Sequence, residues 1–156
     1  MVERLQSEAD ITLAAELQRN ARQTNRALAQ KAGLAPSTTL ARVRDLEANG
    51  VVRGYHAEVD LGALGRPIQA LVFVRLQPKT DEMVNGFIDA VWELPEVIGL
   101  DLISGIEDAV IHVAVPDVEA LNRVVRSKIS SQPGVFDERT SLLFDHRRKA
   151  VIEPLD

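Results

Sequence analysis

Short hydroxyl, methyl and guanidinium side chains gather on one side of residues 36–48, whose sequence is PSTTLARVRDLEA. At 100° per residue, Leu40, Val43 and Leu46 share the inward side of a helix, with Thr39 at its margin. The opposite side of this helix and its flanks carry Ser37, Thr38, Ala41, Arg42 and Arg44. Side chains of these types can contact the edges of DNA bases and the DNA phosphates.

Each of these side chains suits a particular group of a DNA duplex. Arg42 is the candidate for a base contact, through O6 and N7 of guanine. Ser37 and Thr38 can reach base edges or phosphates, and Ala41 can contact a thymine methyl. Phosphate contacts are assigned to three further residues: Thr24 at a helix N-terminus, Arg44 and Arg53.

The elements that must position these side chains are three short helices. Residues 10–20 form the first, with Asp10 as N-cap and Leu13 and Leu17 inward. Residues 25–32 form the second, which Gly33 ends, and Pro36 opens the third. Two helices joined by so tight a turn favour a helix-turn-helix that reads a DNA major groove. An ordinary helical hairpin is the alternative, and these residues alone leave it open.

Two stretches follow the third helix and end the first domain. Residues 51–60 carry little helix signal and predict a wing strand, with Arg53 and Tyr55 near the backbone of a bound duplex. Residues 61–67, LGALGRP, hold two glycines and a proline and predict a hinge. We therefore expect a winged helix-turn-helix domain over 1–60 and a second domain over 68–156.

Charge separates the two parts of the 156-residue chain, whose formal net charge is −5. Residues 19–56 hold seven Arg or Lys against two acids, whereas residues from 67 onward hold nine basic and fifteen acidic side chains. This asymmetry indicates a nucleic-acid module joined to an acidic domain with another task, chance clustering being the alternative. No apolar run approaches a membrane span, so we expect a cytoplasmic protein without a membrane partner.

The second half predicts an α+β domain. Apolar and β-branched runs predict strands over 68–76, 97–104, 109–115 and 135–145. Amphipathic spacing predicts helices over 81–94 and 117–129. The order βαββαβ is the ferredoxin-like plan, a four-stranded antiparallel sheet with both helices on one face.

Apolar side chains occur on both faces of this predicted sheet. The first strand places Ala70, Val72 and Val74 on one face and Leu71 and Phe73 on the other. Because the helices cover one face only, an apolar second face predicts association. We expect a homodimer through this domain, which would present two helix-turn-helix elements to a palindromic operator.

The order of these motifs resembles the Lrp/AsnC, or feast/famine, family of transcriptional regulators. The resemblance covers nearly the whole chain, and no single motif decides it. Its motifs are Asp10-x-x-Leu13, Leu17-Gln18, Arg22, Leu28-Ala29-x-x-x-Gly33-Leu34-x-Pro36, Arg42-Val43-x-x-Leu46-Glu47-x-x-Gly50-Val51-Val52-x-Gly54-Tyr55, Val72-Phe73-Val74, Ser104-Gly105-x-x-Asp108, Val115-Pro116-Asp117 and Pro133-Gly134-Val135.

The resemblance implies a winged helix-turn-helix followed by a regulatory domain, in dimers that assemble into octamers. It also implies an amino acid or related metabolite as effector, bound between subunits near the loop that joins the second and third strands. That loop and one nearby strand supply the candidate residues: Ser104, Gly105, Ile106, Glu107, Asp108 and Thr140.

The chemistry of this loop agrees with an amino-acid ligand. Gly105 lets backbone N–H groups approach a carboxylate, and Asp108 or Glu107 can pair with an ammonium group. An ordinary hairpin turn built on Gly and Asp explains the same residues equally well. Ala109 departs from the family, which usually has an aromatic residue after the loop aspartate.

Two other classes of protein compete with this interpretation. An architectural protein would compact DNA with little sequence preference and without an effector. An enzyme would need a catalytic motif, and the histidines, at positions 56, 112 and 146, show no spacing that suggests a shared metal site. We expect a regulator rather than an enzyme, with no catalytic residue, metal or cofactor.

Overall fold

The computed structural model describes residue 5 and residues 7–155 and divides the chain into two compact units. The N-terminal unit holds the residues up to Ala57 together with those from Arg147 onward, and the sheet unit holds Glu58–His146. The last residues therefore group with the first unit, whereas the sequence predicts a second domain over all of 68–156. The local sequence pattern of an extended C-terminal segment does not indicate which part of the protein the segment contacts.

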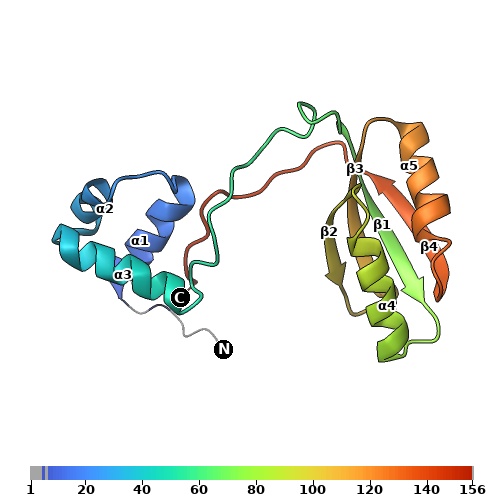
Figure 1. The fold of residues 1–156 in the computed structure, drawn as a ribbon, viewed down its shortest axis with the longest axis horizontal. Helices are drawn as coiled ribbons and strands as arrows, with labels where there is room; N and C mark the ends of the chain where they lie inside the picture. Colours follow the sequence, from blue (N-terminus) through green and yellow to red (C-terminus); the bar gives the residue numbers. More distant parts are fainter. Residues whose placement is uncertain (1–4, 6, 156) are drawn as a thin grey trace. The chain divides into compact units, whose positions relative to one another are not determined.

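Three helices form the body of the N-terminal unit: α1 (Glu8–Arg19), α2 (Asn25–Ala32) and α3 (Pro36–Ala48) (Figure 1). Thr24 caps α2, because its hydroxyl oxygen accepts a hydrogen bond from the Ala27 amide at 3.2 Å. Gly33 ends α2 at φ 68°, in the left-handed region that glycine adopts without strain. The predicted cap of α1 was wrong, since Ser7 occupies the N-cap position and Asp10 lies in the first turn.

The core of this unit consists of Leu13, Leu17, Leu28 and Leu46. The inward side of α3 differs from the prediction: Thr39 is 0% exposed, whereas Leu40 is 42% exposed. Thr39 can be buried because its hydroxyl donates to the Ala35 carbonyl at 3.1 Å, which satisfies its polar group. The helix is therefore rotated so that Leu40 faces outward.

The chain after α3 is extended but is not a strand. Val51 and Val52 pack against the leucine core, and residues 53–60 run on without regular structure. The predicted wing strand is therefore not formed among the described residues of the single chain. Residues 61–65 form turns, which Asp60 stabilises by accepting from the Ala63 amide at 2.7 Å.

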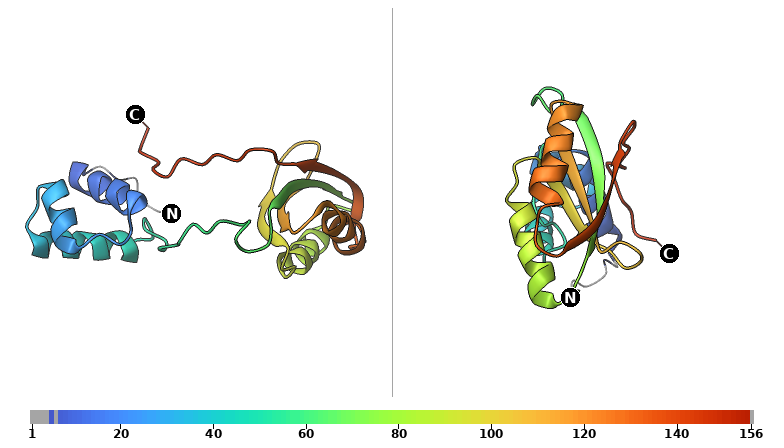
Figure 2. Two further views of the ribbon diagram at one scale, coloured as in Figure 1. Left: turned by 90° about the horizontal axis from the view of Figure 1, so that it is seen from above. Right: turned by 90° about the vertical axis from the view of Figure 1, so that its right-hand side faces the viewer.

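The sheet unit has the predicted ferredoxin-like order. Its neighbouring strands are antiparallel, in the order β2-β3-β1-β4, and both helices lie on one face (Figure 2). A π-helical turn, Val125–Ile129, extends the second helix. The elements are β1 (Ile68–Leu76), α4 (Asp81–Trp92), β2 (Val97–Leu102), β3 (Ala109–Val115), α5 (Val118–Val124) and β4 (Val135–Leu142).

The two faces of the sheet differ in cover and in composition, because the open face also carries His112 opposite Leu71 and Arg139 opposite Phe73. On the helix face, Val72, Val74 and Ile111 are 0% exposed. On the other face, Leu71 and Phe73 are only half-buried. No helix among the described residues has the length and apolar character needed to cross a membrane.

Candidate nucleic-acid interface and effector loop

The outer side of α3 presents small side chains, an exposed leucine and an arginine. Ser37, Thr38, Ala41 and Arg44 are all exposed, and Leu40 joins them. Asn25 donates its side-chain amide to the Pro36 carbonyl at 2.7 Å and so ties the start of α2 to the start of α3. The two helices are thus fixed in a helix-turn-helix whose second helix has an unobstructed, low-relief side.

Arg42 does not lie with this exposed set. Its Nη1 is 3.0 and 3.1 Å from the two carboxylate oxygens of Asp10 on α1, and 3.5 Å from the Ser7 hydroxyl. The guanidinium predicted to reach a base therefore already holds a carboxylate within the protein. Because Asp10 precedes Arg42 by 32 residues, helical periodicity could not reveal this pair.

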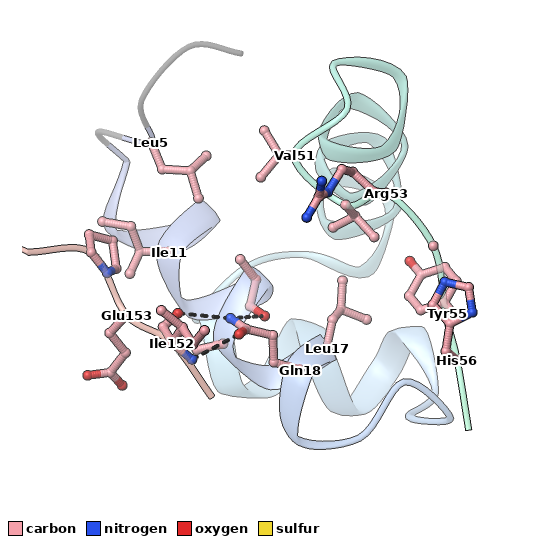
Figure 3. Close-up of a pocket in the computed structure, with 15 residues that line it drawn as sticks. Leu5, Ile11, Leu17, Gln18, Val51, Arg53, Tyr55, His56, Ile152 and Glu153 are labelled. Atoms are coloured by element: carbon pink, nitrogen blue, oxygen red, sulfur yellow. Dashed lines mark hydrogen bonds between the residues drawn. The ribbon is translucent and has the colours of Figure 1, made fainter. Parts of the chain in front are cut away.

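The predicted phosphate contacts come from separate elements. Thr24 caps α2, Arg44 lies on α3, and Arg53 follows α3. Arg53 lines an open cavity of about 730 Å³ within the N-terminal unit, together with Tyr55 and residues of α1 (Figure 3).

Glu16 on α1 is a buried carboxylate that sequence reasoning missed. It accepts hydrogen bonds from Lys31 of α2, from Arg19 at 2.6 Å and from Gln23 at 3.2 Å. The Lys31 ammonium, followed by Arg19 and Gln23, lowers the pKa of Glu16 to about 2. This cluster fastens α1 to α2, as the pair of Asp10 and Arg42 fastens α1 to α3.

The loop between β2 and β3 is held by its own carboxylates. Asp108 accepts from the Leu76 amide at 2.9 Å and pairs with Lys79 at 2.7 Å, while Glu107 pairs with Arg139 at 2.8 Å. Partial burial raises the pKa of Asp108, but the bonds from Lys79 and Leu76 outweigh it and hold the pKa below its usual range. An effector ammonium that binds Asp108 would share this carboxylate with Lys79, and one that binds Glu107 would share it with Arg139.

The tip of this loop is open. At Gly105, with φ 144°, no atom lies within 4 Å of the position that a Cβ would take, and Ile106 is 76% exposed. Ser104 is exposed beside them. Thr140 lies on the edge strand β4 opposite Val72, on the helix side of the sheet, and its hydroxyl donates to Glu138 at 3.1 Å. Within one chain the structure therefore groups residues 104–108 but leaves Thr140 apart.

Two histidines that are distant in sequence lie close together on the sheet unit. The ring centroids of His112 and His146 are 5.8 Å apart, and Nε2 of His112 is 3.1 Å from the side-chain oxygen of Gln69. Their positions 34 residues apart gave no sequence signal. In the part of the chain that the structure describes, no group of three or more His, Cys, Asp or Glu residues could hold a metal ion.

Family comparisons match both units. Residues 6–53 match winged helix-turn-helix DNA-binding proteins, and residues 69–150 match the Lrp/AsnC ligand binding domain. The chain belongs to the Lrp/AsnC family of transcriptional regulators. Its N-terminal unit is accordingly a DNA-binding helix-turn-helix, and its sheet unit is the ligand-binding domain of that family.

Several named regulators are similar to this protein over most of its sequence. The regulator AldR of Mycobacterium tuberculosis is 36% identical over 144 residues, which cover 92% of this chain and 80% of AldR. The leucine-responsive regulatory protein of Escherichia coli is 30% identical over 135 residues, covering 86% and 82%. A transcriptional regulator from Neisseria meningitidis, crystallised with L-Met, superposes with a TM-score of 0.86 at 28% identity, covering 93% and 94%. All three of these similar proteins are named as regulators.

The lowered pKa of Glu16 predicts an acid-sensitive N-terminal unit. The ionised carboxylate stabilises the fold at pH values above its ordinary pKa of 4.5, and this stabilisation is lost as the pH falls towards about 2. Glu16→Gln should therefore unfold at lower urea concentration than the wild type at pH 7, and the difference should shrink between pH 4.5 and 2. Urea unfolding followed by circular dichroism at a series of pH values measures this.

Glu8→Gln, at an exposed acid of the same helix, is the control. A difference between Glu16→Gln and wild type that stays constant over the whole pH range would contradict the assignment.

Proposed function

We propose that this Lrp/AsnC regulator binds a palindromic operator sequence-specifically through the outer side of α3, and that an amino acid modulates it. The observation that carries the proposal is the exposed set Ser37, Thr38, Leu40, Ala41 and Arg44 on a helix fixed by a tight turn. Small side chains let the helix approach the floor of a major groove, and the methyl groups of Ala41 and Leu40 suit thymine.

The pairing of Arg42 with Asp10 changes the role that we propose for this arginine. A guanidinium that makes two bonds to a carboxylate would have to abandon them before it could bind guanine. We infer that Arg42 sets the angle of α3 against α1. Ser37, Thr38 and Ala41 face the bases in this proposal, and Thr24, Arg44 and Arg53 bind phosphates.

Substitutions on α3 test the DNA contacts. Arg44→Ala should weaken binding to all duplexes alike and reduce the slope of log K against log salt by about 0.9 for each bound subunit, or about 1.8 for a dimer, because each subunit loses one phosphate contact. The double variant Ser37→Ala with Thr38→Ala should instead weaken binding to the preferred duplex by about tenfold or more and affect random DNA little. Fluorescence anisotropy over a salt series measures both.

Arg126→Ala, at an exposed arginine of the sheet unit, is the matched control. Equal affinities for every duplex in the wild type would favour the architectural alternative. An unchanged salt slope in Arg44→Ala would show that Arg44 is not a phosphate contact.

The half-buried sheet face supports a dimer of sheet units. Leu71 and Phe73 lie there, and the Arg139 guanidinium stacks on the Phe73 ring with its Cζ 4.5 Å from the ring centroid. Apolar side chains on a face that the chain's own helices do not cover suit a second copy of the same chain. A two-fold dimer would also give the two half-site readers that a palindrome requires. Assembly of dimers into octamers is part of this proposal.

Placing a charge on this face should separate the subunits. Leu71→Glu should reduce the sedimentation coefficient of the full-length protein to that of a smaller species, because a buried unpaired carboxylate is costly. Val118→Glu, at a 58% exposed valine on α5, should leave assembly unchanged. If Leu71→Glu sedimented like the wild type, the subunits would associate through another surface.

The effector proposal rests on the open loop tip and on the ligand-binding domain of the family. Gly105 leaves space beside the backbone, Glu107 and Asp108 supply negative charge, and the Neisseria relative was crystallised with L-Met. In this proposal residues 104–108 of one subunit bind an amino acid near the subunit boundary, where Thr140 of a second copy can join them.

Thermal unfolding with each of the standard amino acids, L-methionine included, tests this. An effector at about 100 times its Kd should stabilise the protein by about 2.7 kcal/mol and raise Tm. Glu107→Gln and Asp108→Asn keep the size of each side chain but remove its charge and its ion pair, and should abolish the rise, whereas Glu119→Gln on α5 should keep it. Asp108→Ala is unsuitable, because it also removes the acceptor of the Leu76 amide. Absence of any rise in the wild type would exclude an amino-acid effector.

A further inference from the structure

The C-terminal segment lies along α1 and is held there by a specific pair of hydrogen bonds. The Gln18 side chain donates from Nε2 to the Ile152 carbonyl at 3.1 Å, and the Ile152 amide donates to Oε1 of Gln18 at 2.9 Å (Figure 3). One side-chain amide thus satisfies both backbone groups of one residue, as a neighbouring strand would. This pairing fixes the register of the segment on the helix.

A second tie continues from this segment into the helical body. Arg19 reaches Glu153 at 3.6 Å with one guanidinium nitrogen and Glu16 at 2.6 Å with another. Glu16 in turn pairs with Lys31 of α2. An unbroken series of polar contacts therefore runs from the C-terminal segment through α1 to α2, and a separate pair, Asp10 and Arg42, ties the same helix α1 to α3.

The segment is lightly held despite these bonds. Ile152 is 72% exposed and Leu155 is 87% exposed, so little apolar surface is buried by docking. Ile152 borders the open cavity that Ile11, Leu17 and Tyr55 also line. Because the leucine core of the N-terminal unit does not include this segment, the segment can detach without unfolding the core.

The same segment is joined covalently to the end of the sheet. Beyond β4, the Leu143 amide donates to the Gln69 carbonyl at 2.9 Å, and His146 lies against His112 of β3. The chain passes from the sheet unit to the N-terminal unit directly after His146. The covalent connection from the end of β4 to the segment on α1 is therefore only a few residues long.

We propose that residues 150–155 form a strap through which the sheet unit controls DNA binding. When the strap is docked, it holds α1, and through Glu16 and Asp10 it holds α2 and α3 in the arrangement that reads DNA. When the strap is released, α1 loosens and DNA binding weakens. The control of DNA binding rests on the function proposed above, whereas docking of the strap does not.

Gln18→Ala in the full-length protein tests the strap, because it removes both bonds to Ile152 without changing any charge. Hydrogen exchange should become faster in α1 and at residues 150–155, while exchange in the sheet unit stays unchanged. Affinity for duplex DNA should fall about three- to tenfold with an unaltered salt slope. Gln30→Ala, at an exposed glutamine of α2, is the matched control and should change neither quantity.

Three results would overturn the proposal, and they differ from one another. Unchanged exchange in α1 would show that the strap does not hold this helix. Faster exchange with unchanged or tighter DNA binding would show that the strap docks but does not control binding. A wild-type protein that binds no duplex would refute the proposed function and the control together, and the exchange data would still report whether the strap docks.

Discussion

The ion pair between Asp10 and Arg42 ties α1 to α3, the helix that we propose reads DNA. Among the described residues, the core of the N-terminal unit is small: four buried leucines with a few partly buried apolar side chains, such as Val43 and Val51, packed against them. The partly buried guanidinium of Arg42 makes two bonds to α1, and the Glu16 cluster holds α1 to α2. All three helices thus depend on α1, whose own position is set by charged groups at both of its ends.

In the sheet unit, apolar burial is concentrated on one face of the sheet. Its two helices bury the centre of one face, including Val72, Val74 and Ile111, and leave Leu71 and Phe73 half-covered on the other. The partly buried carboxylates of the β2–β3 loop, Asp108 and Glu107, are bound to Lys79 and Arg139, which helps to hold the loop in shape. A second copy of the chain would cover this exposed face of the sheet. The two-fold symmetry of such a dimer would also present two copies of α3 to DNA.

Sequence reasoning succeeded where structure is local. Periodicity, Gly33 and Pro36 predicted the helices and the turn of the N-terminal unit, and the alternation of apolar runs predicted the βαββαβ order. It failed where a partner lies far along the chain. Thr39 is buried in place of Leu40 because a hydroxyl can bond the preceding turn, and this rotation directs Arg42 towards Asp10. The contact of Gln18 with Ile152 spans 134 residues, and no local pattern encodes it.

Selection of preferred duplexes from a random library by the whole 156-residue chain tests whether α3 reads DNA sequence. We expect enrichment of one motif built from two inverted half-sites, whose centres are about 10 base pairs or a multiple of that apart. Binding to the library without enrichment of any motif would contradict this expectation, and would mean that α3 contacts DNA without reading its sequence.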